Sequence, residues 1–173
     1  LSLHDALPIW EVVDIGIPHC FIEQESCSEH VLCDGFFGLI IPGRRPDSHK
    51  GTYGHVCVLA GSPGKTGAGI MAARAAMRSG AGLVTLGVPE SLNAVFEAQL
   101  TEAMTEPVPD SGTGILSPAS REAVRSLIAG KSVIAVGPGL SQHADTVEFF
   151  FSLLKDAGAP LVVDADGLNI LAR

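Results

Sequence analysis

The sequence is poor in aromatic residues and contains no long apolar run. Aromatics make up only 5% of the 173 residues, so the core must rest on Ala, Val, Leu and Ile. No stretch of about 18 uncharged apolar residues occurs, so no membrane span is predicted. The hydrophobic fraction of 46% nevertheless excludes a disordered chain. At this length the chain can form one α/β domain with a real core, but not two full domains.

Positive charge is also scarce. The 11 Lys and Arg residues are outnumbered by 19 Asp and Glu residues, which gives a formal net charge of −8. Such an acidic chain argues against nucleic acid or an anionic membrane as a partner. It does not exclude a phosphate ligand, because backbone dipoles act locally.

The sequence lacks a CxxC pattern, which argues against a cysteine metal site. Its four cysteines are Cys20, Cys27, Cys33 and Cys57. Cys57 lies within an apolar strand and is predicted to be a small core residue. A disulfide among the other three stays open. The α/β pattern and the lack of a recognisable signal-peptide pattern favour a reduced, cytoplasmic protein.

Apolar runs alternate with helical patterns along most of the chain. Strands are predicted at 55–60, 83–88, 132–136 and 160–163. Helices are predicted at 68–79, 91–99, 118–129, 144–156 and 168–173. Near-continuous apolar strands joined by helices indicate an α/β fold with a parallel sheet covered on both faces. The segment 101–118 is expected to be a loop or a short edge strand.

The amino-terminal part has a different character. Residues 1–9 resemble a translated sequencing adapter, so we expect an artefactual segment that is not part of the fold. Residues 10–19 form an apolar run that is interpreted as the last strand of an upstream unit. Residues 20–48 have no clean periodicity and are interpreted as a linker, with a short strand or turn at 37–41.

Several local features give testable expectations. Ser91 and Ser117 are predicted helix N-caps, with Pro118 in the first helical position after Ser117. The aromatic run 149–151 is expected to be mostly buried. Lys50 is either an anion contact or part of a solvated turn.

The Gly-rich loop from Gly61 to Gly69 resembles a phosphate-binding loop, but the spacing of its residues does not fit the known phosphate-binding patterns. A P-loop requires a glycine at the position that Leu59 occupies. The run from Gly67 to Ala72 matches the dinucleotide pattern G-x-G-x-x-[GA], but six residues separate it from the strand. Small residues for helix–sheet packing explain this run at least as well as nucleotide binding.

Two strand ends carry further candidate residues. Gly137-Pro138-Gly139 follows one strand directly, where glycine permits a ligand to approach the main chain. Asp164 and Asp166 follow another strand, and paired carboxylates there suit metal, hydroxyl or proton contacts. Asp166 is alternatively the N-cap of the final helix. Asn169 lies one helical turn further on and is expected to face the same cleft.

Four motifs occur in the order found in one family: HKGTYGHVCVLAGSPGKTGA, AGLVTLGVP, VGPGL and VVDADGLN. In this respect residues 40–173 resemble the NAD(P)H-hydrate dehydratases, which are ADP- or ATP-dependent repair enzymes with a ribokinase-like three-layer α/β/α fold. The resemblance implies that Ala68 and Gly139 contact the hydrated nucleotide. It also implies, less directly, that Gly137, Asp164 and Asn169 line the same cleft. The family has Gly where this chain has Ser141, which puts the local loop shape in question.

The resemblance further implies a substrate, a nucleotide and a domain division. The substrate is the hydrate of NADH or NADPH, the cosubstrate is ADP or ATP with Mg²⁺, and self-association is common. Residues 10–40 then correspond to the tail of an epimerase domain with its linker. Residues 41–173 correspond to the amino-terminal part of the dehydratase domain.

In the family, the H-x-G-E segment, the Lys-Gly nucleotide strand and the G-x-G-D motif all follow the DAD strand, and none of them follows Asp164-Ala165-Asp166 in this sequence. The catalytic carboxylate is therefore expected beyond residue 173, and the chain is expected to be inactive alone. Two alternatives stay open. One is a ribokinase-like kinase for a sugar or vitamin, and the other is a nucleotide-binding module without catalysis.

Overall fold

The computed structural model describes residues 15–22 and 43–173, and the chain divides into two units, Leu1–Arg44 and Arg45–Arg173. In the first unit, residues 15–18 form no strand and α2 (His19–Ile22) is a single helical turn, so the described part of the strand predicted at 10–19 is not a strand. The predicted artefact at 1–9, the element at 37–41, Cys27 and Cys33 lie outside the described residues.

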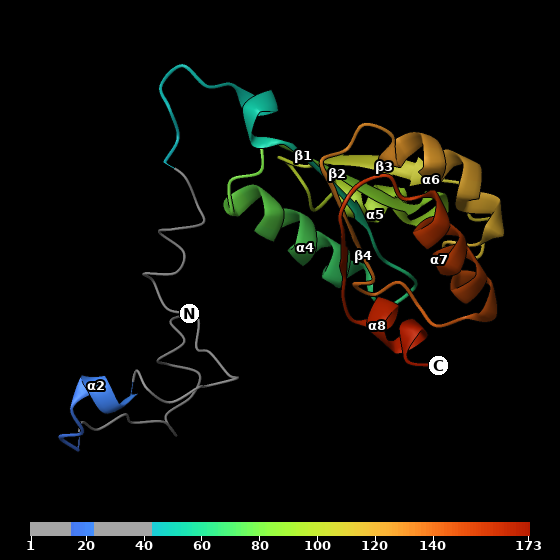
Figure 1. Ribbon diagram of the computed structural model, residues 1–173. Helices are drawn as coiled ribbons and strands as arrows, with labels where there is room; N and C mark the ends of the chain where they lie inside the picture. Colours follow the sequence, from blue (N-terminus) through green and yellow to red (C-terminus); the bar gives the residue numbers. More distant parts are fainter. Residues whose placement is uncertain (1–14, 23–42) are drawn as a thin grey trace. The chain divides into compact units, whose positions relative to one another are not determined.

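The second unit is built on a five-stranded sheet in the order β3-β2-β1-β4-β5. Figure 1 labels β1, β2, β3 and β4 of this sheet and the helices around it. The strands are β1 (His55–Leu59), β2 (Leu83–Pro89), β3 (Met104–Val108), β4 (Val133–Val136) and β5 (Leu161–Val163). Every pairing among the described strands is parallel. All their carboxyl ends therefore meet at one edge, where open α/β sheets place their ligands.

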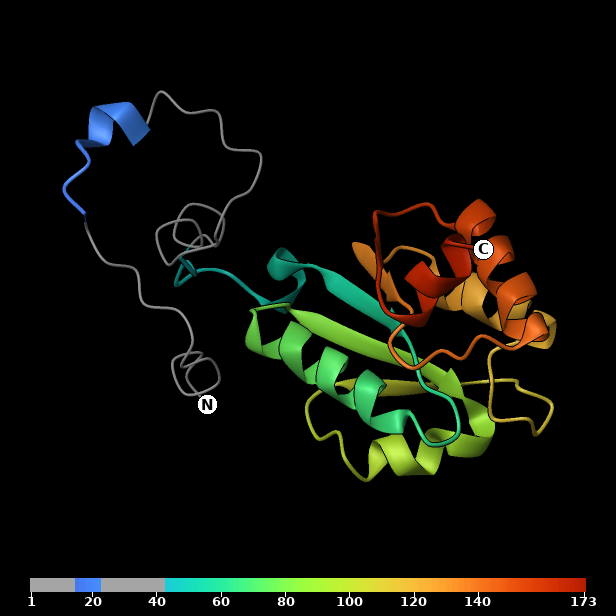
Figure 2. The ribbon, with the colours of Figure 1, turned by 90° about the horizontal axis from the view of Figure 1, so that it is seen from below.

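Helices cover both faces of this sheet, which confirms the predicted three-layer arrangement. On one face lie α4 (Thr66–Arg78) and α5 (Asn93–Glu97), and α4 runs alongside β2 (Figure 2). On the other lie α6 (Arg121–Ile128) and α7 (Ala144–Asp156). A Cβ added at Gly69 of α4 would lie 3.1 Å from the Cβ of Ala60. The small residues of α4 thus allow close helix–sheet packing, as one of the two interpretations predicted.

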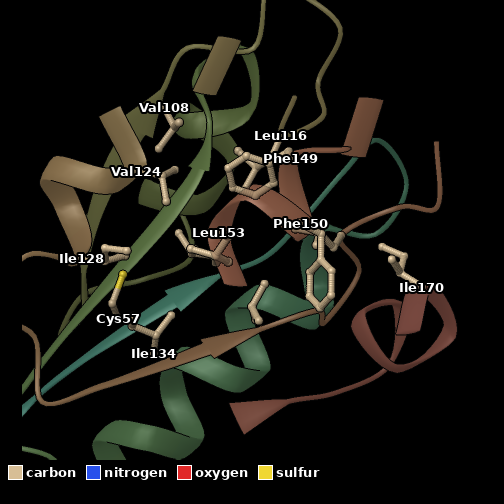
Figure 3. Packing of buried hydrophobic residues seen from close by; sticks show 13 residues of the cluster. Cys57, Val108, Leu116, Val124, Ile128, Ile134, Phe149, Phe150, Leu153 and Ile170 are labelled. Carbon is tan, nitrogen blue, oxygen red and sulfur yellow. The ribbon is translucent and has the colours of Figure 1, made fainter. Parts of the chain in front are cut away.

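The core on the α6 and α7 face explains which aromatic residues of α7 are buried (Figure 3). Phe149 and Phe150 are 1% and 0% exposed and pack among residues such as Leu116, Ile134 and Leu153. Phe151 is 43% exposed, so the expectation that all three phenylalanines are mostly buried is wrong for this one. The helical period of 3.6 residues turns position 151 away from the sheet.

The segment after β2 also differs from the prediction. In place of a helix over 91–99 there is a 3-10 turn, Glu90–Leu92, followed by the short helix α5. Ser91 is not an N-cap, because its hydroxyl donates to Asp110 Oδ2 instead. The edge-strand alternative for 101–118 is confirmed by β3, whose Pro107 is tolerated because the strand lies at the edge of the sheet.

Two further local predictions are confirmed, the first of them in part. Ser117 is the N-cap of a 3-10 turn, Pro118–Ser120, with Pro118 in its first position, but α6 begins only at Arg121 and has Ser120 at its N-cap. Cys57 is fully buried in β1, and burial raises the pKa of its thiol to about 12. Cys20 and Cys57, the two cysteines in the described ranges, are free thiols. Across those ranges, no helix has the length and hydropathy that crossing a membrane requires.

Asp110 closes the loop that follows β3. The residue is 3% exposed, and its carboxylate accepts the Ser91 hydroxyl and the amides of Gly112 and Gly114, at 2.9 and 2.8 Å for the two amides. Burial alone would raise the pKa of Asp110, but these hydrogen bonds more than offset it and lower the pKa below its usual value of 3.8. The charged form is therefore favoured in the folded state.

We expect Asp110 to make folding sensitive to acid. A carboxyl whose pKa is lowered by folding contributes stability above its unfolded pKa and loses it as pH falls through the folded value. Asp110→Asn should lower the free energy of unfolding at neutral pH by about 2 kcal/mol, since two amides then face a neutral side chain. The loss of stability below pH 4 or so should be smaller than in the unsubstituted chain.

Urea unfolding between pH 3 and pH 7, followed by circular dichroism, measures both effects. The control is Asp47→Asn, at an exposed carboxylate paired with Arg45, which should change stability by less than about 1 kcal/mol. An Asp110→Asn variant with the acid dependence of the unsubstituted chain would contradict this account.

Candidate functional site at the carboxyl edge of the sheet

Three loops meet where β1, β4 and β5 end. The amide of Gly61, after β1, donates to the carbonyl of Pro138 at 3.1 Å. The buried hydroxyl of Ser62 donates to the carbonyl of Gly139 at 2.8 Å. The amide of Asp164, after β5, donates to the carbonyl of Val136 at 3.1 Å. Main-chain groups from separate βα units are thus held together at the edge where ligands are expected.

The two glycines of Gly137-Pro138-Gly139 are required by these contacts. A Cβ on Gly137 (φ +125°) would lie 1.9 Å from the carbonyl oxygen of Asp164. A Cβ on Gly139 (φ +65°) would lie 2.6 Å from the carbonyl oxygen of Lys65 and 3.2 Å from the Cβ of Ala68. The structure therefore places Ala68 directly beside Gly139, and Gly137 directly beside Asp164.

Asp166 joins the β1 and β4 loops through its side chain. The residue is 8% exposed and begins α8 (Asp166–Leu171). Its Oδ2 accepts from Lys65 Nζ and from the Ser141 amide, both at 3.0 Å, and its Oδ1 accepts from Gln142 Nε2 at 3.0 Å. The interpretation of Asp166 as a helix N-cap is wrong: the cap position belongs to Ala165, and the Asp166 carboxylate is occupied by these three donors.

A further contact fixes the orientation of Gln142. Arg173 donates to Gln142 Oε1 at 2.7 Å, which leaves the amide nitrogen of Gln142 facing Asp166. Burial alone would raise the pKa of Asp166, but the hydrogen bonds from Gln142, Lys65 and Ser141 lower it below its usual value. The carboxylate is therefore charged at neutral pH, and its bonds are charge-assisted.

Ser141 occupies a backbone conformation that favours glycine. Its φ is +85°, where the sequence resemblance led us to expect Gly. We expect Ser141→Gly to raise the free energy of unfolding by about 0.5–1 kcal/mol, because the strain of a left-handed side-chain residue is removed. The gain is partly offset by the loss of the hydrogen bond from the His143 amide to the Ser141 hydroxyl.

Chemical unfolding of Ser141→Gly beside Ser79→Gly measures this effect. Ser79 is the C-cap residue of α4 and has φ −73°, so glycine should reduce stability there by about 0.5–1 kcal/mol through backbone entropy. Equal destabilisation by both substitutions would contradict a strained conformation at Ser141.

The sequence-predicted site residues are only partly brought together. Gly137, Gly139 and Asp164 lie on the meeting loops, and Ala68 lies beside Gly139 in the first turn of α4. Asp164 and Asn169 are both exposed. Lys50 is exposed in a 3-10 turn (Lys50–Tyr53) that precedes β1, at the opposite end of the strands, which favours its interpretation as part of a solvated turn.

The sequence analysis missed three polar residues of the site: Lys65, Gln142 and, as a loop contact, Ser62. Lys65 had a weak signal, since it stands between a Gly-rich loop and a helix. No sequence pattern pointed to Ser62 or Gln142.

The described residues do not form a Mg²⁺ site at this edge. The two carboxylates predicted there are Asp164 and Asp166. Both oxygens of Asp166 already accept hydrogen bonds from Lys65, Gln142 and the Ser141 amide. No cluster of three or more His, Cys, Asp or Glu side chains in the described part of the chain is placed to hold a metal ion. The edge instead offers glycine main chain, small side chains and one ion pair, a surface that a bulky organic ligand can approach closely.

The parallel sheet and its strand-end loops define a ribokinase-like α/β protein. The structure superposes on a ribokinase-like superfamily protein from Enterococcus faecalis with a TM-score of 0.64 and 25% identity, covering 76% of this chain and 44% of that one. A protein-family model for NAD(P)H-hydrate dehydratase matches residues 56–173. The chain therefore belongs to the NAD(P)H-hydrate dehydratase family.

Two other relatives support this assignment. The chain is 40% identical over 162 residues to a bifunctional NAD(P)H-hydrate repair enzyme Nnr of Moorella thermoacetica, covering 94% of this chain and 31% of the relative. It is 30% identical to the ADP/ATP-dependent NAD(P)H-hydrate dehydratase of Bacillus subtilis, co-crystallised with ATP/Mg²⁺. That match has a TM-score of 0.61 and covers 78% of this chain and 45% of the other. The chain thus spans about a third of the length of the bifunctional relative.

Proposed function

We propose that this chain supplies the part of an ADP- or ATP-dependent NAD(P)H-hydrate dehydratase that holds the hydrated nicotinamide nucleotide. The observation that carries the proposal is the meeting of the β1, β4 and β5 loops, which sets Ala68 against Gly139 and Gly137 against Asp164. This arrangement lies within the segment that matches the family. Asn169, exposed on α8, belongs to the same proposed surface.

The chemistry is a phosphoryl transfer followed by an elimination. The terminal phosphoryl group of ADP or ATP passes to the hydroxyl oxygen of the hydrate, whose proton goes to the carboxylate of the expected G-x-G-D segment, and AMP or ADP is left. The carbon–oxygen bond then breaks, phosphate departs with the electron pair, and loss of a proton from the neighbouring carbon restores the ring double bond. Phosphoryl transfer depends on positioning and charge stabilisation. In this proposal the described loops supply the positioning, and the reacting carboxylate comes from the expected G-x-G-D segment.

The activity test compares this chain with the product of its complete gene. Each protein is given NADH hydrate with ADP or with ATP, and recovery of the reduced-nicotinamide absorbance is followed. We expect turnover only by the complete product and none by residues 1–173 alone. Binding of the hydrate without turnover by the complete product would instead indicate a nucleotide-binding module. Phosphorylation of a sugar or vitamin in its place would indicate a kinase.

The domain division, the cellular location and the oligomeric state of the protein are part of the same proposal. Residues 10–40 are assigned to the tail of an upstream epimerase domain with its linker, and residues 41–173 to the dehydratase domain. A cytoplasmic location and self-association are also proposed. Fractionation of cells that express the complete gene tests the location, and light scattering during size-exclusion chromatography tests the oligomeric state.

A further inference from the structure

We propose that Asp166 is a positioning residue for the nucleotide-hydrate surface, acting through Lys65 on one side and Ser141 and Gln142 on the other. This inference rests on the proposed function, because it assigns a role within the same site. The carboxylate joins donors 101, 25 and 24 residues away in sequence. It is thus a direct side-chain link between the β1 loop and the β4 loop.

The placement of this link explains why it would affect the ligand surface. Lys65 is the residue directly before α4, whose third residue is Ala68. Ser141 follows Gly139 by two residues, and the Gly139 Cα lies against the Lys65 main chain and Ala68. Breaking the link would leave only the bonds from Gly61 and Ser62 to hold the two loops, and would therefore loosen them beside Ala68 and Gly139.

The bonds of Asp166 to the β4 loop and its ion pair with Lys65 differ in how exposed and how well supported they are. The Ser141 amide and Gln142 are neutral donors, and Gln142 is itself held by Arg173. The Lys65 side chain is 51% exposed, while that of Asp166 is 11% exposed. The β4 side is therefore the firm half of the link. The Lys65 ion pair is the more exposed half, and it adds to the bonds from Gly61 and Ser62 that also join the β1 and β4 loops.

A second ion pair in the same domain provides a matched control. Arg121 and Asp156 are also joined at 3.0 Å, with side chains 53% and 17% exposed, close to the values for Lys65 and Asp166. Asp156 is the last residue of α7, before the amino end of β5, and so lies away from the three loops. Asp156→Asn removes a comparable interaction without touching the proposed surface.

The kinetic test uses the complete gene product with Asp166→Asn and Lys65→Met. We expect the KM for NADH hydrate to rise about tenfold in each variant while the KM for ADP or ATP changes less than about twofold. In the double variant the effects should be less than additive, because both substitutions break the same link. Lys65→Arg, which keeps the charge, should restore the hydrate KM to within about threefold.

A merely structural role predicts a different pattern. Partial unfolding would lower the apparent kcat and leave both KM values unchanged, as we expect for Asp156→Asn if it has any effect. Equal KM changes for hydrate and adenine nucleotide, or a hydrate KM unchanged in Asp166→Asn, would overturn the proposal. No turnover by the unsubstituted complete product would instead refute the proposed function.

A second measurement tests the link on the present chain without any activity. Hydrogen exchange is followed by mass spectrometry in peptides that cover 61–68 and 137–143. Asp166→Asn should speed exchange in both peptides, and Lys65→Met should do so mainly in the first. Asp156→Asn should leave both unchanged. Unaltered exchange in Asp166→Asn would overturn the link itself, whatever the kinetics show.

Discussion

Replacing Gly137 with Ala is expected to lower the free energy of unfolding by at least about 4 kcal/mol, near the upper end for a single substitution. The added Cβ would lie 1.9 Å from the Asp164 carbonyl oxygen and 2.9 Å from the Gly167 amide nitrogen. Both neighbours are main-chain atoms, so no side chain can rotate to make room. The φ of +125° adds strain, because residues with a side chain rarely adopt it.

Gly130→Ala is the control that distinguishes the steric clash of an added Cβ from the strain of a positive φ. Gly130 follows α6 with φ +70°, and a Cβ added there would meet nothing within 4 Å. Its replacement should reduce stability by only about 1–2 kcal/mol, from the left-handed conformation alone. Urea unfolding of both variants, followed by circular dichroism, measures the difference. Similar stabilities for the two would mean that the β4 and β5 loops can separate without loss of folding free energy.

Much of the sheet could be predicted because most of its strands are apolar runs that can be recognised in the sequence. The runs of β1, β2 and β4 are mostly apolar and largely buried, as strands covered on both faces require. β5 is apolar as well, although Val162 is exposed. β3 was predicted only as an alternative, since Glu106 and Pro107 interrupt its apolar pattern. The helix at 91–99 was overestimated because the Ser91 hydroxyl is used by Asp110, which lies 19 residues further along.

The candidate site was predictable only where a local pattern carried it. Glycine at a strand end identified the β4 loop, and the structure gives the physical reason in the close approach of Gly137 to Asp164. The bonds made by Asp166 could not be foreseen, because an Asp at the start of a helix fits both an N-cap and a link between loops when only the sequence is known. Only the folded chain brings Lys65 within 3.0 Å of that carboxylate.

Phe150 lies between the core and the site, so its truncation should affect both. The side chain is fully buried against the sheet. Phe150→Ala should lower the free energy of unfolding by about 3–5 kcal/mol, as expected for an aromatic ring removed from a core. The ring also lies 3.3 Å from the position of a Cβ added at Gly167, next to Asp166. A cavity there would remove support from the start of α8.

Phe151→Ala is the matched control, since it removes the same ring one position away. Phe151 is 43% exposed, and its ring packs edge to face on that of Phe150, with 5.9 Å between the ring centroids. Removal of the Phe151 ring should therefore lower the free energy of unfolding by less than about 1.5 kcal/mol. Chemical unfolding compares the two variants, and hydrogen exchange compares α8 with α4. Phe150→Ala should speed exchange at the Asn169 amide, which now bonds the Ala165 carbonyl at 3.0 Å, more than within α4. Equal acceleration in both helices would show that Phe150 supports the fold as a whole and not the Asp166 end of α8 in particular.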